Sequence, residues 1–187
     1  VISDYDSIDV DTTNYLIPLE FICRYFVAGS LHDRIKRDDV DYKKLGFDDE
    51  PDYGERLPEP LFEVTTKLED YDRKLTKEEA LDISGLTNEE FDEIRDIVLT
   101  VDELIEENVE KNGLLHVDGK KEFAMDENRN IMLVDTFGTA DEDRFWELDE
   151  YENNNFVQRS KEFVRQYYRD IGYHKELIEA RRKDEED

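Results

Sequence analysis

Residues 87–113 place the strongest constraint on the fold, because their pattern predicts one long amphipathic helix. Thr87 and Glu90 have the spacing of a capping box, and Gly113 is suited to end the helix. Apolar side chains recur at helical spacing and predict a single core-facing stripe, formed by Phe91, Ile94, Val98, Val101 and Ile105. We interpret the many acids between them as the solvated face of the same helix.

Strand patterns precede this helix. Residues 15–31 are the most apolar part of the chain and predict a buried strand broken near Pro18, followed by a tight turn or a helix start. Residues 57–67 alternate in the manner of a strand, whereas residues 32–56 are charged and predict a loop-rich connector. A short helix then ends at Gly85.

Strand and helix patterns also follow the long helix. Residues 114–117 begin a strand that leads into a hairpin, and Ser160 is suited to cap a tail helix. A second helical piece is predicted at residues 174–183, and residues 1–14 predict an irregular lead-in. Because strands and helices do not alternate regularly, the predicted fold class is α+β, an antiparallel sheet with flanking helices.

The composition excludes several classes of protein. The chain has 187 residues, enough for one domain or one and a half, and 25 basic against 52 acidic residues leave a net charge of −27. Such a chain lacks the basic surface that a nucleic acid partner requires, and no apolar stretch approaches the ~20 residues of a membrane span. The N-terminus carries no secretory pattern, so we expect a cytoplasmic protein. The sequence leaves the oligomeric state open, including a homo-oligomer.

Cysteine and histidine offer little chemistry. The single cysteine, Cys23, excludes an internal disulfide, and its apolar neighbours predict a buried structural thiol. The three histidines, His32, His116 and His174, lack metal-ligand spacing.

A hairpin within residues 116–138 places acids where a half-buried strand prefers apolar side chains. With the turn centred on the segment ENRN, Glu122 faces Asp135, and alternation puts Asp118 and Lys120 on the same face. Two carboxylates about 5 Å apart repel each other unless a cation lies between them. Mg²⁺ suits this position, because it binds one or two carboxylates and keeps sites for phosphate oxygens.

An ion network is the alternative interpretation of this hairpin. One acid would pair with Lys120 or Lys121, and a register shift of one residue would separate Glu122 from Asp135. Hairpin geometry alone favours the network over a metal site.

Arginine and serine side chains near glycine-containing turns suggest a site for phosphate or carboxylate groups. Arg24 and Ser30 bracket one such segment, and Arg144 and Arg165 follow the hairpin. Each of these residues alone is more often part of a surface ion pair.

Five segments in order resemble the SAICAR synthetase family, the phosphoribosylaminoimidazole-succinocarboxamide synthases of purine biosynthesis. They are IPLEFICRYFVAGSL, LPEPLFEVTTKLEDYD, GLLHVDGKKEFAMDENRNIMLVD, DEDRFW and SKEFVRQY, and the resemblance extends from about Tyr15 to about Arg169. The sequences of the segments NYLIPLE, HVDGK and SKEFVRQY are most similar to the archaeal branch of the family. Each segment alone is weak evidence for the family, but five segments in the right order and spacing are strong evidence.

The resemblance implies an ATP-dependent ligase that joins L-aspartate to the carboxylate of the aminoimidazole ribonucleotide CAIR, with ATP and Mg²⁺ as cofactors. The carboxylate would be activated as an acyl phosphate. Phosphoryl transfer depends on positioning and charge neutralisation, which fits a chain without a Ser-His or Cys-His constellation. The sequence does not identify the group that accepts the proton from the aspartate amine.

The resemblance also implies roles for particular residues. Residues close to the reacting groups would be Lys67, Asp72, Asp118 and Lys120. Residues that bind substrate would be Arg24, Ser30, Arg144, Lys161 and Arg165. Glu122 and Asp135 would hold Mg²⁺ against ATP. The family resemblance and the flanking arginines therefore favour a Mg²⁺–nucleotide site at this hairpin over the ion network.

The sequence departs from the family pattern in several places. The family's N-terminal lobe, with its lysine-bearing strands over the ATP phosphates, is not recognisable, and Val1 favours an N-terminal truncation as the reason. We therefore predict that residues 1–23 end the connection to that lobe and that residues 24–187 form the substrate- and metal-binding domain. Tyr25 replaces the usual Asn after Arg24, Tyr71 replaces a His, and a one-residue length difference precedes Arg144.

Two other functions remain as alternatives: a non-catalytic acidic binding or scaffold protein, and a different ATP-dependent carboxylate–amine ligase. A scaffold has no reason to bring the predicted site residues together. Convergence of Glu122, Asp135, Arg24, Arg144 and Arg165 on one cleft therefore separates an enzyme from a scaffold.

Overall fold

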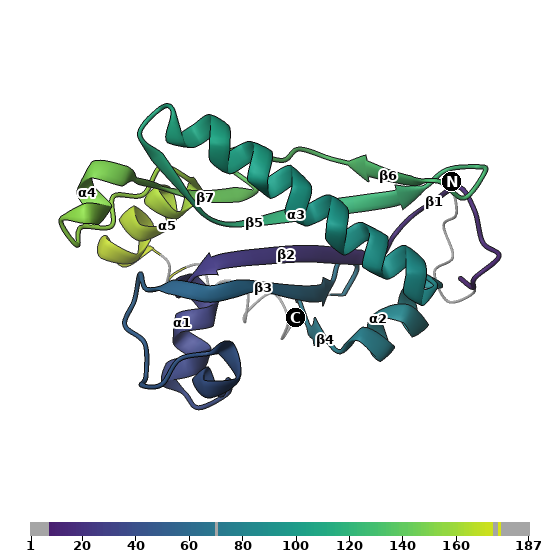
Figure 1. The fold of residues 1–187 in the computed structure, drawn as a ribbon, viewed down its shortest axis with the longest axis horizontal. Helices are drawn as coiled ribbons and strands as arrows, with labels where there is room; N and C mark the ends of the chain where they lie inside the picture. Colours follow the sequence, from purple (N-terminus) through teal and green to yellow (C-terminus); the bar gives the residue numbers. More distant parts are fainter. Residues whose placement is uncertain (1–7, 70, 174–175, 177–187) are drawn as a thin grey trace.

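The computed structural model describes residues 8–69, 71–173 and 176. Its centre is a seven-stranded sheet in which every pairing between strands is antiparallel. Helices flank this sheet, and Figure 1 shows the long helix α3 (Asn88–Glu110) running diagonally across it. The predicted α+β class with an antiparallel sheet and flanking helices is confirmed. The strands are β1 (Tyr15–Leu16), β2 (Leu19–Phe26), β3 (Arg56–Thr66), β4 (Lys74–Leu75), β5 (Leu114–Met125), β6 (Ile131–Val134) and β7 (Asp143–Glu147).

Strand β5 organises the sheet, because it pairs with four other strands. Its N-terminal half pairs with β7, its middle with β2, and its C-terminal end with β1 and β6. On the far side of β2, the sheet continues through β3 to β4. The predicted break at Pro18 is confirmed, since it separates β1 from β2.

The sheet has one face covered by α3 and one face that stays accessible. Phe21 and Cys23 of β2 and Phe123 of β5 pack in one core cluster with Phe91 and Ile94 of α3. Cys23 is buried, as predicted. Since side chains alternate along a strand, the residues between these positions point to the other face, where the candidate site lies.

The two helices on either side of Gly85 begin where local signals predict, but the long helix ends at Glu110, before the predicted Gly113. Helices α2 (Lys77–Ser84) and α3 (Asn88–Glu110) each start with a capping box, in which Thr76 pairs with Glu79 and Thr87 with Glu90. Gly85 has a φ of +65°, which suits the residue that ends α2.

The predicted faces of α3 need one correction. The apolar stripe is confirmed at its start, where Phe91, Ile94 and Val98 are buried. Asp102, however, is 1% exposed, although the acids of this helix were expected to be solvated. It faces the sheet because it lies four residues after Val98, on the same stripe.

Residues 32–56 contain more structure than the predicted connector. Helix α1 (Gly29–Lys36) and a 3₁₀ turn, η2 (Tyr42–Leu45), lie within or overlap this range. Leu31 and Ile35 of α1 are four residues apart and bury against Leu57. The charged residues around them hid this short apolar pattern.

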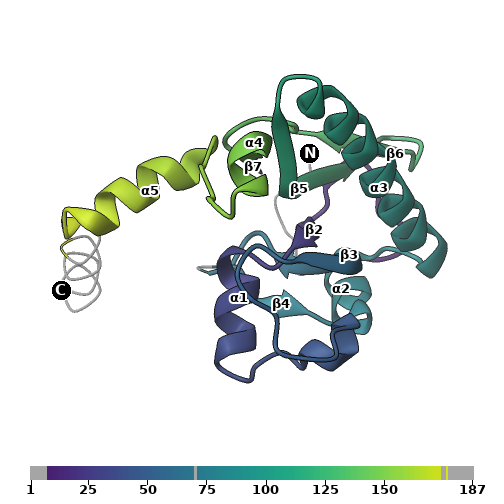
Figure 2. The same cartoon turned by 60° about the vertical axis from the view of Figure 1, so that its left-hand side comes forward.

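The C-terminal part carries two further helices, α4 (Leu148–Glu152) and α5 (Lys161–Asp170). Ser160 caps α5 as predicted, since its Oγ accepts a hydrogen bond from the Glu162 N–H. Figure 2 shows α5 extending away from the sheet. The second helical piece predicted at residues 174–183 and His174 fall outside the described residues, apart from residue 176.

No helix in the described part of the chain is long and apolar enough to cross a bilayer. Strand β2 runs without interruption through residues 23 and 24, where the sequence predicts a division. That residues 1–23 end a connection to an N-terminal lobe stays a prediction.

Candidate functional site

An open cleft of about 580 Å³ lies on the face of the sheet away from α3, between β2, β5, α1 and α5. It collects most of the side chains that the sequence singled out. The predicted site residues that line it are Arg24, Ser30, Asp72, Asp118, Lys120, Arg144, Lys161 and Arg165. As many cationic as acidic side chains line the cleft, although the whole chain has 25 basic and 52 acidic residues. The cleft is therefore enriched in cations relative to the rest of the protein.

The floor of the cleft is a row of three side chains across three strands. In the register, Asp118 of β5 lies opposite Arg24 of β2 on one side and opposite Arg144 of β7 on the other. Asp118 Oδ2 accepts from Arg24 Nη1 at 3.1 Å and from Arg144 Nη1 at 2.9 Å. One carboxylate oxygen thus holds two guanidinium groups side by side, with their remaining N–H donors available to an anion.

The start of α1 completes this corner. Arg24 Nη2 donates to Ser30 Oγ at 3.2 Å. Gly29 has a φ of +51°, and a Cβ there would lie 2.6 Å from Arg144 Nη2, so only glycine lets the guanidinium group approach the helix start. Arg24, Ser30 and Arg144 are therefore brought together, as the sequence analysis expects of residues that bind one substrate.

Glu63 of β3 contacts Arg24, at one end of the Arg24–Asp118–Arg144 row, and the sequence analysis did not name it. Its carboxylate accepts from Arg24 Nε and Arg34 Nη2, both at 2.8 Å, and from Lys74 Nζ at 2.6 Å. Burial opposes its ionisation, but the hydrogen bond from Arg34 and the charges of Arg24 and Lys74 outweigh burial and lower the pKa of Glu63 to about 2. The alternation of residues 57–67 was visible, but the partner of Glu63 depends on the register between β2 and β3.

Lys120 stands at the centre of a second group of charges. Its Nζ lies 2.7 Å from Glu20 Oε1, 3.2 Å from Glu122 Oε1 and 3.2 Å from Glu142 Oε2. Burial lowers the pKa of Lys120, but Glu20 and Glu142 more than compensate, so the net shift is upward and the ammonium stays charged. Glu20 and Glu142 also line the cleft, and the sequence analysis did not name them.

Glu122 and Lys67 lie next to this group rather than on the cleft lining. Glu122 Oε2 forms an ion pair with Lys67 Nζ at 2.6 Å, and the Glu122 side chain is almost fully buried. The ion network that the hairpin geometry favoured is thus present, with Glu122 between Lys67 and Lys120.

The predicted register of the hairpin is wrong by one residue. Glu122 pairs with Val134 and not with Asp135, and β6 ends at Val134. Each residue of β5 thus pairs with the residue one position earlier in β6 than predicted. Asp135 is exposed, has a φ of +63°, and accepts a hydrogen bond from the Thr136 N–H. It does not belong to the lining of the cleft. The hydrogen bonds of the turn fit this register: the Asp126 side chain accepts from the N–H groups of Asn128 and Asn130, and the turn is centred on Asn128 rather than between Asn128 and Arg129.

Helix α5 and the segment after β3 contribute the more exposed walls. Lys161 pairs with Asp141 at 3.2 Å, and Arg165 lies 3.6 Å from Glu162 on its own helix. Asp72 lines the cleft and is exposed. These side chains are less constrained than the Arg24–Asp118–Arg144 row.

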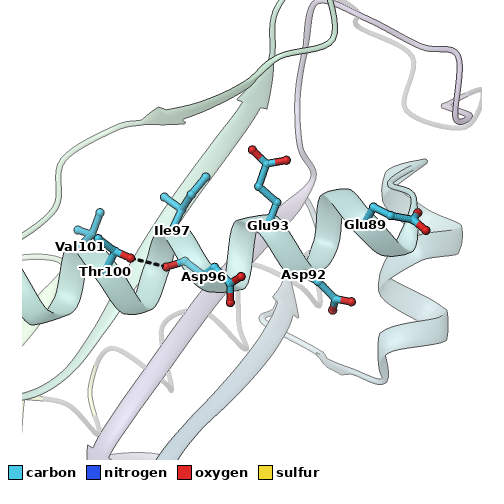
Figure 3. Close-up of a pocket in the computed structure, with 7 residues that line it drawn as sticks. All are labelled: Glu89, Asp92, Glu93, Asp96, Ile97, Thr100 and Val101. Carbon is cyan, nitrogen blue, oxygen red and sulfur yellow. Dashed lines mark hydrogen bonds between the residues drawn. The ribbon is translucent and has the colours of Figure 1, made fainter.

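A second hollow lies on the outer surface of α3 and differs in kind. Its lining comes from this one helix: Glu89, Asp92, Glu93, Asp96, Ile97, Thr100 and Val101. Figure 3 shows the carboxylates pointing in different directions, and its only marked bond joins Thr100 to the Asp96 carbonyl within the helix, at 2.9 Å. The expectation that these acids form a solvated face is confirmed for this part of α3.

Residues 8–180 match the family model of SAICAR synthetase. The chain belongs to the SAICAR synthetase family. It is 55% identical over 176 residues to the phosphoribosylaminoimidazole-succinocarboxamide synthase of Thermoplasma volcanium, an alignment that covers 94% of this chain and 60% of the relative. The chain therefore spans about 60% of the length of that relative. The archaeal resemblance of the sequence is confirmed.

Solved structures of the SAICAR synthetase family share the fold. A SAICAR synthetase in complex with ADP aligns with a TM-score of 0.64 and 30% identity, over 80% of this chain and 56% of that one. The enzyme from Saccharomyces cerevisiae, in complex with SAICAR, aligns with a TM-score of 0.64 and 25% identity, over 84% of this chain and 51% of that one. Both alignments cover only part of the longer proteins.

Proposed function

We propose that the protein to which this chain belongs is an ATP-dependent ligase that joins L-aspartate to the carboxylate of CAIR, giving SAICAR, ADP and phosphate. The observation that carries the proposal is the row of Arg24, Asp118 and Arg144 in a cleft of a SAICAR synthetase family member. The Thermoplasma relative bears the name of this activity, one solved relative holds ADP, and the yeast relative holds SAICAR.

The cationic corner suits the anionic nucleotide substrate. Arg24 and Arg144 present charged N–H donors at a shared position, and Ser30 adds a hydroxyl at the start of α1. Phosphate and carboxylate groups bind such forked donors strongly. Lys161 and Arg165, on the α5 wall, would bind the second carboxylate-bearing substrate or a phosphate group from the open side.

Glu122 and Asp135 are the proposed carboxylates for Mg²⁺, and their chemistry fits a hard cation. Glu122 is held by Lys67 and Lys120, so binding of a cation would replace part of that ion network. Asp135 directly follows Val134, the residue opposite Glu122, so it would have to turn toward Glu122 for both carboxylates to hold one cation. A bound Mg²⁺ would neutralise charge on the phosphates of ATP.

The remaining site residues position the reacting groups. Asp118 fixes both guanidinium groups, so they need not reorganise when substrate binds, and Lys120 stays charged beside them. Lys67 and Asp72 are proposed to lie near the carboxylate that is activated. Such preorganisation is what phosphoryl transfer and attack by an amine require.

The proposed partners are small molecules: CAIR, L-aspartate and ATP. A cytoplasmic location and the absence of a nucleic acid or membrane partner stay predictions, and so does a homo-oligomer. Of the five residues whose convergence separates an enzyme from a scaffold, Arg24, Arg144 and Arg165 line one cleft, whereas Glu122 and Asp135 are not part of its lining. The three arginines make a scaffold the weaker candidate.

The test is an assay of the full-length protein with CAIR, L-aspartate, ATP and Mg²⁺, with SAICAR and ADP measured separately. We expect both products in equal amounts, and no SAICAR when aspartate is omitted. Formation of ADP with a different amine or a different carboxylate would identify another ligase of the same type. No ATP-dependent product with any of these substrates would overturn the proposal.

A further inference from the structure

Directly behind the cleft, on the α3 side of β5, lies a buried group of four titratable side chains: Asp102 of α3, His116 and Lys121 of β5, and Asp143 of β7. All four are buried. Lys121 Nζ contacts both Asp102 Oδ1 and, at 2.8 Å, Asp143 Oδ1. His116 Nε2 lies 2.9 Å from the same Asp143 oxygen, and must donate there because a carboxylate only accepts. The proposed reaction uses none of these four.

Asp102, His116 and Asp143 have ligand atoms within 4.8 Å of one another, and this spacing would also suit a metal ion. Lys121 supplies the positive charge among them, since its ammonium contacts both carboxylates. The Lys121 ammonium thus occupies the position between the two carboxylates that a metal ion would otherwise take.

A β-bulge explains how His116 comes to this face. Residues His116 and Asp118 pair with the consecutive residues Phe145 and Arg144, so one extra residue of β5 is accommodated between them. The bulge shifts the alternation by one position. His116 then shares a face with Lys121, whereas Asp118 points into the cleft. Without the bulge, His116 and Asp118 would lie on the same face.

Asp143 ties this bulge to the neighbouring strand and loop. Its Oδ1 accepts from Lys121 and His116, and its Oδ2 accepts from the Gly138 N–H at 2.6 Å. Gly119 lies opposite Asp143, and a Cβ at Gly119 would collide with the Asp143 carboxylate, so the close approach depends on glycine. Asp143 thus holds the strand that carries Arg144 and the loop that carries Glu142.

Three members of the cluster lie near cleft residues. Asp143 precedes Arg144, Lys121 lies between Lys120 and Glu122, and Asp102 accepts from Tyr25, which follows Arg24. Only Asp143 lies on the strand that carries Arg144, so its displacement would move that strand directly. Asp102 differs from Asp143 because it lies on α3, away from the strand that carries Arg144.

We propose that Asp143 is a positioning residue: with Lys121 and His116 it fixes the bulge of β5 against β7, and so aims Arg144 at Asp118 and at the substrate. Asp102 anchors the cluster to α3 and stabilises the fold without setting the position of Arg144. As far as it concerns substrate, this inference rests on the proposed function.

The two acids provide a matched test, because Asp143→Asn and Asp102→Asn make the same chemical change at the same lysine. In the full-length protein, we expect Asp143→Asn to lower kcat/KM for CAIR on the order of 10²-fold, mainly through a higher KM, because misplacement of a binding group by about 1 Å costs that much. Asp102→Asn should lower the Tm and leave the KM for CAIR within about twofold of the wild type.

The result that overturns the proposal is an unchanged KM for CAIR in folded Asp143→Asn, or a KM that rises equally in both variants in proportion to their loss of Tm. A purely structural role would reduce the amount of folded enzyme and leave KM unchanged. If Asp143→Asn does not fold, His116→Phe decides, because it removes only the Nε2 contact. It should raise the KM in the same direction by a smaller factor, and an unchanged KM would count against the proposal.

Crystal structures of the variants separate this inference from the proposed function. If the wild-type protein makes no SAICAR, the proposed function fails, but the positioning role is still decided by the 2.9 Å contact of Arg144 Nη1 with Asp118 Oδ2. That contact should persist in Asp102→Asn and be lost in Asp143→Asn or His116→Phe. Persistence in all three variants overturns the positioning role.

Discussion

Lys120 and Lys121 are neighbours in β5 and both contact several carboxylates, but their surroundings differ. The Lys120 side chain is 24% exposed and lines the cleft, whereas the Lys121 side chain is 0% exposed and closed in between α3 and β7. Burial lowers the pKa of both lysines and their acidic partners outweigh it, so the net shift is upward for both. Two ion clusters with the same residue types thus lie back to back on one strand.

The difference shows how one strand separates binding from support. The cluster in the cleft has solvent on one side, so a ligand can replace some of its internal contacts. The cluster behind it has no such access, and a missing partner would leave an uncompensated buried charge. Ionisable residues in the cleft are therefore candidates for function, and those behind it for stability and position.

The largest expected effect comes from a pair of substitutions that tests this contrast. Lys121→Met should lower the free energy of unfolding by about 3–5 kcal/mol, because it leaves Asp102 and Asp143 without a cation. Lys120→Met should cost less than Lys121→Met, since Lys120 is 24% exposed and Glu122 keeps its ion pair with Lys67, but it should reduce activity. Urea unfolding of both variants measures the difference, and a larger stability loss for Lys120→Met would contradict the contrast.

Acid should weaken the cleft through Glu63. Its pKa lies below the ordinary 4.5, at about 2, so its ionised form stabilises the fold above pH 4.5 and this stability is lost as the pH falls toward 2. The contribution is on the order of 3 kcal/mol. Unfolding free energies at pH 5 and pH 2 should therefore differ more for the wild type than for Glu63→Gln. Equal pH dependence would show that the carboxylate of Glu63 is not stabilised by Arg24, Arg34 and Lys74.

The proposed metal carboxylates sharpen the comparison at the edge of the cleft. Glu122→Gln and Asp135→Asn should each raise the Mg²⁺ concentration for half-maximal activity by about tenfold or more. The measurement is a Mg²⁺ titration at fixed ATP. If only Glu122→Gln responds, the corrected register has removed Asp135 from the metal site.

The smallest effect is expected on the outer surface of α3. Glu93→Gln should change the free energy of unfolding by no more than about 0.5 kcal/mol and leave activity unchanged. Glu93 is exposed and lies on the outer surface of α3, whereas the acids of the cleft are paired with cations. Thermal unfolding and the SAICAR assay test this. A larger change would mean that the acidic hollow of α3 has a role of its own.

The sequence by itself determined the elements that depend on local signals. Capping boxes and apolar spacing gave the start of α3 and its buried residues, and Pro18 and Ser160 marked the break before β2 and the start of α5. These signals act within a few residues, so they need no knowledge of the partner strands. The resemblance to the family also named half of the residues that line the cleft.

The tertiary structure alone decided which charges lie in the cleft and which lie behind it. Alternation placed Asp118, Lys120 and Glu122 on one face, but the bulge that moves His116 to the other face is visible only in the pairing of β5 with β7. The register that separates Asp135 from Glu122 depends on the turn, and the burial of Asp102 and Glu63 depends on strands far away in the sequence. Charged side chains carry no local signal of burial, because their stability inside a protein comes entirely from the partners that the fold brings to them.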